Sequence, residues 1–309
     1  MSKVTILLST YNGEKYLSEL LKSLIQQTYK DWICYIHDDG SSDGTVSILH
    51  QFSERYIEHF KILDYPSTGG AKENFISLLN YPTTDYIMFC DQDDVWLPTK
   101  IKVTLDKMKN IEHSKTQVPT VIFTDLKVVD KNLNTIADSY FSYEHRDPNK
   151  IELKNLLQKN IAAGCTMMIN KRMLKLAIQN VQLLNLAMHD WGIMLLGCAE
   201  GSIGYVQSAT IMYRQHENNQ VGATQAASYD RLKSLLLGKK IIAIYQSVQL
   251  ERDFVRRLSE NVKKNSQYYS FLQQFSKVLL QNKFHRMKFY LENNLIDLNS
   301  MRILRVLFV

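Results

Sequence analysis

The chain has 309 residues, of which 45% are hydrophobic and 22% are charged, with 12 glycines and only 5 prolines. This composition excludes a disordered, collagen-like or low-complexity protein, and a chain of this length can bury a sizeable hydrophobic core. The four cysteines are widely separated, so they form neither a C-x-x-C metal motif nor a dense disulfide framework, and we expect a reducing compartment. We also expect no signal peptide, because the apolar run at residues 4–8 is followed at once by polar residues.

The net charge of +6 is concentrated at the end of the chain. Residues 228–309 contain 15 Lys and Arg against 6 Asp and Glu, which is +9, and residues 1–227 contain 22 against 25, which is −3. The basic part suits nucleic acid, an anionic membrane surface or a plain solvated helical face. Residues 232–242 and 301–309 interleave cations with large apolar side chains, which is typical of an interfacial helix and favours the membrane surface. We expect no membrane-spanning segment.

Strands and helices alternate along the first part of the chain. Strands are predicted at residues 4–9, 32–36, 60–63 and 86–90, and helices at 16–25, 46–52 and 75–79. Such alternation predicts a parallel sheet with crossover helices.

The pattern is less regular after residue 90. We predict helices at residues 100–108 and 190–199, strands at 121–124, 164–169 and 204–213, and a loop at 131–148. From residue 228 onward the pattern is helical and rich in Leu, Lys, Arg and Gln. The sequence therefore predicts an α/β protein with a helical extension at its end.

Three carboxylates follow the fourth predicted strand. Asp91, Asp93 and Asp94 are crowded within four positions, where their mutual repulsion is costly unless a cation is present. Oxygen ligands at a strand end suit Mg²⁺ or Mn²⁺. The alternative is a turn with acidic helix-capping residues.

Polar residues also follow the first two strands, and carboxyl ends of parallel strands meet at the ligand-binding edge of a sheet. Thr10, Tyr11 and Asn12 follow the first strand, and Asp38 and Asp39 follow the second. Together they are candidates for a nucleoside pocket, in which Tyr11 offers an aromatic face and an aspartate accepts hydrogen bonds from base or ribose. On its own, the second cluster would also suit an ordinary turn and helix cap.

Phosphate-binding signatures are missing from the sequence. Neither the Walker A pattern nor G-x-G-x-x-G follows the first strand, which disfavours kinase-like and dinucleotide-binding proteins. Lys72 and Asn74, after the glycine pair at 69–70, are candidates for positioning a diphosphate.

The ordered set of motifs resembles the family 2 glycosyltransferases of the GT-A fold, over about residues 3–225. The set comprises STYN at 9–12, DDGSSD at 38–43, DQDDVW at 91–96, HDW at 189–191 and YRQHENN at 213–219. The last two are similar to the bacterial rhamnosyltransferase-like branch that builds surface polysaccharide. The chain departs from the family pattern at Ser9, where proline is commoner, and at Glu217, where this branch often has glycine.

The resemblance implies a GT-A-type Rossmann-like mixed sheet, mostly parallel and flanked by helices, and an inverting transfer by direct displacement. Residues 1–227 would form the catalytic domain and residues 228–309 a basic helical region for a membrane surface or a partner. Asp190 matches the general base, although an N-cap aspartate is the alternative. The remaining roles carried over are metal binding for Asp91, Asp93 and His216, donor binding for Asp91 and Arg214, and acceptor or sugar contact for Trp96, His189 and Trp191. His216 would also suit a simple hydrogen-bonding role, and both tryptophans would also suit core packing.

The resemblance further implies a nucleotide-diphosphate sugar as donor, dTDP-rhamnose or a UDP-hexose, with Mg²⁺ or Mn²⁺. The acceptor would be a lipid-linked saccharide at the cytoplasmic face of the cell membrane, with the enzyme peripheral there. The alternative is a nucleotide-sugar-binding protein or nucleotidyltransferase, but its early Gly-rich signature with Arg and Lys is missing. We expect no nucleic-acid partner, because the basic region lacks interleaved aromatic residues in a recognised module.

Overall fold

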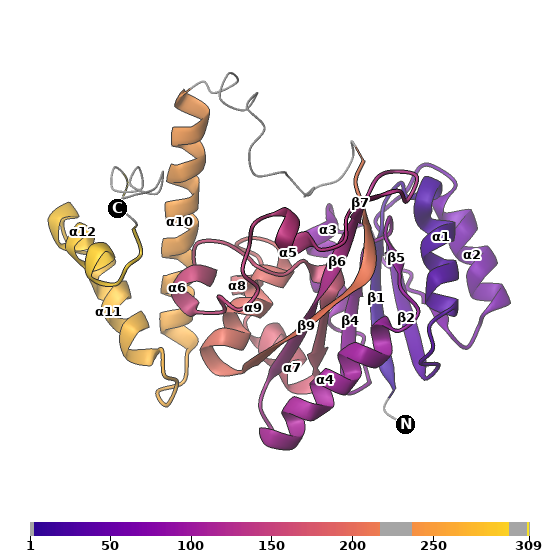
Figure 1. The fold of residues 1–309 in the computed structure, drawn as a ribbon, viewed down its shortest axis with the longest axis horizontal. Coiled ribbons are helices and arrows are strands. Elements are labelled where there is room, and N and C mark those ends of the chain that lie inside the picture. The colour runs from indigo at the N-terminus through magenta and orange to yellow at the C-terminus, as the bar shows by residue number, and fades with distance from the viewer. Residues whose placement is uncertain (1–2, 217–236, 297–307, 309) are drawn as a thin grey trace.

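The computed structural model of the protein describes residues 3–216, 237–296 and 308, which form a helix-flanked sheet with a helical extension (Figure 1). Glu217, Asn218 and Asn219 of the last motif lie outside the described residues, as do residues 232–236, 301–307 and 309 of the two basic–apolar segments.

A nine-stranded mixed sheet forms the centre of the molecule, in the order β3-β2-β1-β4-β8-β6-β9-β5, with β7 beside β6. The strands are β1 (Val4–Thr10), β2 (Trp32–Asp38), β3 (Phe60–Ile62), β4 (Tyr86–Cys90), β5 (Val95–Trp96), β6 (Thr120–Val129), β7 (Thr135–Ala137), β8 (Met167–Asn170) and β9 (Ser202–Arg214). The ladders that join β3, β2, β1 and β4 are all parallel, as is that between β6 and β9. Antiparallel ladders involve β5, β7 and β8. The predicted mixed α/β sheet is confirmed.

Helices cover both faces of the sheet (Figure 1). The helices beside the sheet are α1 (Glu14–Ile25), α2 (Thr45–Arg55), α3 (Ala71–Leu78), α4 (Lys100–Ser114), α5 (Tyr140–Tyr143), α6 (Leu153–Leu156), α7 (Lys171–Gln179), α8 (Val181–Leu184) and α9 (His189–Glu200). The helices of the extension are α10 (Leu237–Asn261), α11 (Tyr269–Leu279) and α12 (Lys283–Glu292). Strand β1 is buried along its whole length, and its side chains alternate between two cores. Leu7 joins the core under α3 and α9, whereas Ile6 and Leu8 join the core under α1 and α4.

Two predictions of local structure were wrong in detail. The loop predicted at residues 131–148 contains β7 and α5, because the chain returns to pair with the end of β6. The strand predicted at 164–169 begins instead with a 3₁₀ turn at Gly164–Thr166, and β8 starts at Met167.

The C-terminal helices share a core with the sheet-containing part. Trp191 of α9 packs on Phe254 of α10 with ring centroids 5.1 Å apart, and Ser266 Oγ donates to the Ala199 carbonyl at 2.5 Å. Buried side chains from α10, α11 and α12 belong to the same apolar cluster as α9. Among the described helices, none is long and apolar enough to cross a membrane.

Candidate active site

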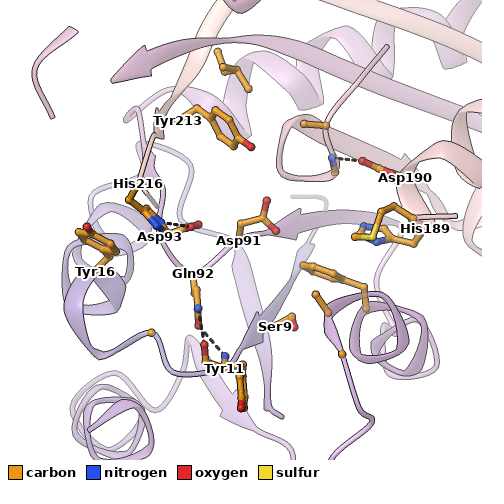
Figure 2. Close-up of a pocket in the computed structure, with 18 of the residues that line it drawn as sticks. Ser9, Tyr11, Tyr16, Asp91, Gln92, Asp93, His189, Asp190, Tyr213 and His216 are labelled. Carbon is orange, nitrogen blue, oxygen red and sulfur yellow. Dashed lines mark hydrogen bonds and ion pairs between the residues drawn. The ribbon is translucent and has the colours of Figure 1, made fainter. Parts of the chain in front are cut away.

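A cavity of about 2080 Å³ lies at the carboxyl ends of β1, β2 and β4 (Figure 2). Its walls also include the loop at residues 159–164, the start of α9 and the end of β9. Of the residues singled out in the sequence, those that line it are Tyr11, Asn12, Asp39, Asp91, Asp93, His189, Asp190, Trp191 and His216. The convergence at this edge follows from the parallel arrangement of the three strands.

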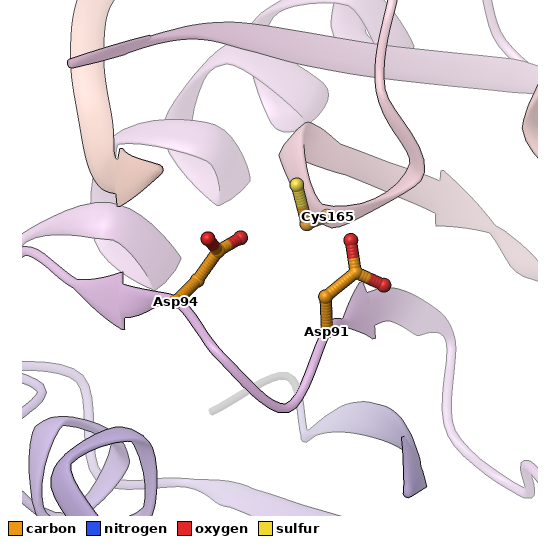
Figure 3. Close-up of side chains that lie close together, drawn as sticks. All are labelled: Asp91, Asp94 and Cys165. Atoms are coloured by element: carbon orange, nitrogen blue, oxygen red, sulfur yellow. The ribbon is translucent and has the colours of Figure 1, made fainter. Parts of the chain in front are cut away.

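Asp91 and Asp94 occupy one end of β4 together with Cys165, and potential ligand atoms of the three lie within 4.8 Å of one another (Figure 3). Burial, reinforced by the negative charges of Asp93 and Asp190, raises the pKa of Asp91 to about 7. Burial and neighbouring carboxylates also raise the pKa of Asp94 well above its ordinary value. Asp94 Oδ1 accepts from the Arg214 backbone N–H at 3.2 Å, but its buried Oδ2 atom has no hydrogen-bond partner among the described residues. Crowded, poorly solvated carboxylates of this kind are stabilised by a cation.

Asp93 points to the other side of the loop and meets His216 from the end of β9. Asp93 Oδ2 and His216 Nε2 are 2.8 Å apart, and both side chains line the cavity (Figure 2). Burial raises the pKa of Cys165 well above its ordinary value, so this thiol is neutral and a poor ligand. The available donors are therefore carboxylate oxygens and an imidazole, a set that fits Mg²⁺ or Mn²⁺.

Asp190 lies in the first turn of α9, where Met188 is the N-cap residue. Its Oδ2 atom accepts from the Gly164 N–H at 3.0 Å, and its Oδ1 atom accepts from the Trp191 N–H at 2.6 Å. Burial raises the pKa of Asp190 to about 6, against the lowering effect of these hydrogen bonds and of one to Asn160. The group is thus ionised at neutral pH, yet more basic than a solvated aspartate.

Asp91 lies between the Asp93–His216 pair and Asp190 in the cavity (Figure 2). Asp190 comes from α9 and the loop that supports it comes from the 3₁₀ turn before β8, so distant segments build the two walls. A carboxylate suited to take a proton therefore faces a group of carboxylates suited to hold a cation.

Gln92 is a site residue that the sequence analysis missed. Its side-chain amide pairs with the backbone of Tyr11: Tyr11 N–H donates to Oε1 at 2.8 Å, and Nε2 donates to the Tyr11 carbonyl at 2.8 Å. This pairing ties the loop after β1 to the loop after β4, and it leaves the Tyr11 side chain 57% exposed at the cavity. The signal available in the sequence was an amide side chain within an acidic cluster at a strand end.

Asp39 holds the loop at residues 67–70. It accepts hydrogen bonds from the Thr68 backbone N–H, from Thr68 Oγ1 at 2.9 Å and from Ser67 Oγ at 3.0 Å. Burial alone would raise the pKa of Asp39, but these hydrogen bonds outweigh burial and lower the pKa below its ordinary value. Asp39 therefore remains ionised beside the cavity and shapes it.

Thr10 and Asp38 hydrogen-bond each other and are not among the residues that line the cavity, and their assignment to donor contact stays a prediction. Thr10 Oγ1 donates to Asp38 Oδ1 at 2.8 Å, and Ser41 N–H donates to Asp38 Oδ2 at 2.7 Å. Asn12 does line the cavity, but its Oδ1 atom accepts from the Ser42 N–H at 2.9 Å. These side chains brace the loops after β1 and β2.

Lys72 and Asn74 are not among the residues that line the cavity, and the diphosphate role predicted for them stays a prediction. Lys72 Nζ donates to the Asn185 carbonyl at 3.1 Å, and buried Asn74 hydrogen-bonds His37 Nδ1 at 2.8 Å. The reason is helical periodicity, because the cavity face of α3 is the one that carries Ala71 and Phe75.

Arg214 is buried and hydrogen-bonded within the protein, and its assignment to donor binding stays a prediction. Its Nε donates to the Asp93 carbonyl at 2.9 Å, its Nη1 to the Lys131 carbonyl at 2.7 Å and its Nη2 to Glu19 Oε2 at 2.5 Å. The guanidinium also stacks over Tyr16, 4.4 Å from the ring centroid. It does not line the cavity.

The three residues predicted to touch sugar differ in position. Trp96 is buried, with Lys100 Nζ 4.7 Å from its ring, and the sugar contact predicted for it was wrong because β5 turns it into the core. Trp191 lines the cavity, while its Nε1 donates to the Leu156 carbonyl at 2.6 Å. His189 lines the cavity from a buried position against Phe75, and burial lowers its pKa to about 3, so it is neutral.

Comparison with solved structures defines the class of fold. TarS residues 1–349 of S. aureus, solved with UDP-GlcNAc, match with a TM-score of 0.52 at 18% identity, over 98% of this chain and 90% of that chain. The mannosyltransferase PcManGT from Pyrobaculum calidifontis, solved with GDP-Man and Mn²⁺, matches with a TM-score of 0.50 at 13% identity, over 93% and 73%. The fold is that of the GT-A glycosyltransferases, as predicted.

Sequence comparison defines the family. The chain is 34% identical over 242 residues to the dTDP-rhamnosyl transferase RfbG of Shigella flexneri, covering 73% of this chain and 78% of that protein. It is 29% identical over 171 residues to the UDP-Glc:alpha-D-GlcNAc-diphosphoundecaprenol beta-1,3-glucosyltransferase WfgD of Escherichia coli, covering 55% and 61%. The family model of glycosyl transferase family 2 matches residues 5–175. The chain belongs to glycosyl transferase family 2 and is a glycosyltransferase, which confirms the predicted family.

Proposed function

We propose that the protein transfers a sugar, with inversion, from a nucleoside-diphosphate donor to a hydroxyl group of a saccharide in surface polysaccharide synthesis. The observation that carries this proposal is that Asp91, Asp93 and Asp190 line a single cavity. Its volume of about 2080 Å³ exceeds the roughly 300–1,000 Å³ of typical small-ligand pockets, so it has room for a donor and an acceptor together.

The donor end of the cavity is proposed to lie beside Tyr11 and Asp39. Tyr11 presents an exposed ring on which a base can stack, and the ionised carboxylate of Asp39 stands at the same wall. dTDP-rhamnose is the favoured donor because the relative at 34% identity is a dTDP-rhamnosyl transferase, and a UDP-hexose is the second candidate.

Asp91, Asp93 and His216 are proposed to hold the divalent cation. The raised pKa of Asp91, the unpartnered Oδ2 of Asp94 behind it and the Asp93–His216 contact all support a cation at this wall. When bound, Mg²⁺ or Mn²⁺ supplies positive charge to the diphosphate leaving group. Arg214 stabilises this wall, because its Nε donates a hydrogen bond to the Asp93 carbonyl.

Asp190 is proposed to deprotonate the acceptor hydroxyl. Its carboxylate is held by the backbone N–H groups of Gly164 and Trp191 and is ionised above about pH 6. General-base catalysis contributes about 10²–10⁴-fold in rate. His189 and Trp191, at the same wall, are proposed to contact the acceptor.

We propose a lipid-linked acceptor at the cytoplasmic membrane face, with residues 1–227 as the catalytic domain and residues 228–309 as the region that approaches the membrane. Support for the acceptor comes from WfgD, whose name specifies a diphosphoundecaprenol substrate. The boundary at residue 227 is supported by the cavity: among the described residues, none after His216 lines it.

The test is donor turnover with dTDP-rhamnose and UDP-hexoses in the presence of Mg²⁺, Mn²⁺ or a chelator. Asp190→Asn should lower turnover by about 10²–10⁴-fold while nucleotide binding persists. Asp106→Asn is the matched control, because Asp106 is an exposed residue of α4 that pairs with Lys102. Full turnover by Asp190→Asn, or nucleotide binding without any sugar transfer by the wild type, would contradict the proposal.

A further inference from the structure

Large apolar side chains are exposed on the last three helices. Of the eleven strongly exposed large hydrophobic residues in the described chain, five belong to this region: Ile242, Tyr245, Leu280, Phe284 and Leu291. Leu280 is 87% exposed and Phe284 is 67% exposed. Scattered single apolar residues are ordinary on a protein surface, whereas a concentration in one region indicates a contact surface.

Leu280 and Phe284 lie at the corner between α11 and α12. Every residue from 280 to 285 is exposed. Along α12, Phe284, Lys288 and Leu291 share one exposed face at helical spacing, whereas Phe289 and Tyr290 are buried in the core. Because Phe289 and Tyr290 already anchor the helix, packing among the described residues does not account for the exposed Phe284 and Leu291.

Basic side chains surround this apolar corner. Residues 277–292, from the end of α11 to the end of α12, contain four Lys and Arg and one acidic residue, Glu292, a balance of +3. We define the α11–α12 patch by its exposed members: Lys277, Leu280, Lys283, Phe284, Lys288 and Leu291. Glu292 Oε1 lies 3.8 Å from Lys288 Nζ in an exposed ion pair. Exposed ion pairs contribute little to stability, so this pair does not prevent Lys288 from contacting another anion.

We propose that the α11–α12 patch docks on an anionic phospholipid surface. Interleaved lysines and large apolar groups on an exposed helix are typical of interfacial helices, which insert apolar side chains and attract anionic headgroups. Lysine is depleted in protein–protein interfaces, which disfavours a protein partner or a second copy of this chain. This inference deepens the membrane part of the proposed function but does not rest on the transfer chemistry, because no patch residue lines the cavity.

The experiment is co-sedimentation of the full-length protein with phosphatidylcholine vesicles, with and without phosphatidylglycerol. The wild type should bind only the anionic vesicles, and binding should weaken at high salt. Lys283→Gln with Lys288→Gln should lower the partition coefficient by about thirtyfold, since two basic groups near an anionic surface together contribute about 2 kcal/mol. At high salt the electrostatic attraction is screened and the apolar contribution remains. Leu280→Ser with Phe284→Ser should therefore lower the partition coefficient at high salt more than the two lysine substitutions do.

Ile57→Ser is the matched control, because Ile57 is 72% exposed but follows α2, at the opposite end of the molecule (Figure 1). All variants should keep the wild-type circular dichroism spectrum, melting temperature and nucleotide binding, so that a loss of vesicle binding is separable from a failure of the proposed transfer function. The proposal is overturned if the Leu280/Phe284 variant binds vesicles as the wild type does, or if the wild type does not bind them. It is also overturned if light scattering shows that this variant converts an oligomer to a monomer, since the patch would then join copies of the chain.

Discussion

The Nε2 atom of His216 lies 2.8 Å from the Oδ2 atom of Asp93, although 123 positions separate the two residues in the chain. The contact joins the loop after β4 to the segment that follows β9, so it closes one wall of the cavity. In the proposed function, a divalent cation is held at this contact and at Asp91.

Asp93→Ala should abolish metal-dependent nucleotide binding. The variant removes a carboxylate ligand and leaves His216 without its partner. A thermal-shift titration of dTDP and UDP with and without Mn²⁺ measures this, because a specific ligand raises the melting temperature by mass action. Asp106→Ala serves as the control, and an Asp93→Ala variant that still gains affinity from Mn²⁺ would show that the ligand assignment is wrong.

Turnover should fall below about pH 6, because protonation of Asp190 removes the proposed base. Burial raises the pKa of Asp190 to about 6, so the active carboxylate form predominates above that pH and decreases about tenfold per pH unit below it. The profile should be measured at saturating Mn²⁺, because a bound cation lowers the pKa of Asp91 and leaves Asp190 as the group that titrates in this range. A profile that stays flat well below pH 6 would contradict the assignment.

Gly13→Ala should weaken nucleotide binding through Gln92. A Cβ atom at position 13 would lie 2.3 Å from Gln92 Oε1, so the amide must move and release the Tyr11 backbone. Gly13 has a φ of −101°, so alanine fits the backbone itself and stability should change little.

A double-mutant cycle checks this coupling by calorimetry. Gln92→Ala alone should weaken binding to a similar degree, and adding Gly13→Ala to it should cost almost nothing further. Strictly additive losses would mean that the two positions act independently.

Arg214→Lys should lower the free energy of unfolding by about 3 kcal/mol, since the ammonium group cannot replace hydrogen bonds to Glu19 and to two carbonyl groups. Half-saturation with Mn²⁺ should also require a higher concentration, because the Asp93 carbonyl loses its donor. Urea denaturation and metal titration measure the two effects. Arg256→Lys, at an exposed position, should change neither quantity. Unchanged metal affinity in a destabilised Arg214→Lys protein would show that Arg214 is purely structural.

The sequence alone determined the α/β class, the strand-end clusters and their convergence, because alternating strands and helices bring the carboxyl ends of parallel strands to one edge. It also supplied the family through ordered motifs, and with them Asp91, Asp93, Asp190 and His216 as candidates. What a motif leaves open is where each side chain points, since that depends on the elements packed around it.

Only the tertiary structure shows that Trp96 is buried in the core and that Arg214 hydrogen-bonds the Asp93 carbonyl. It also shows that Lys72 and Asn74 hydrogen-bond Asn185 and His37 and do not line the cavity. Only the tertiary structure paired Gln92 with the Tyr11 backbone, because that contact spans 81 positions and two loops. The same holds for the α11–α12 patch: periodicity predicts which residues share a face of a helix, but the neighbouring helices decide which face stays exposed.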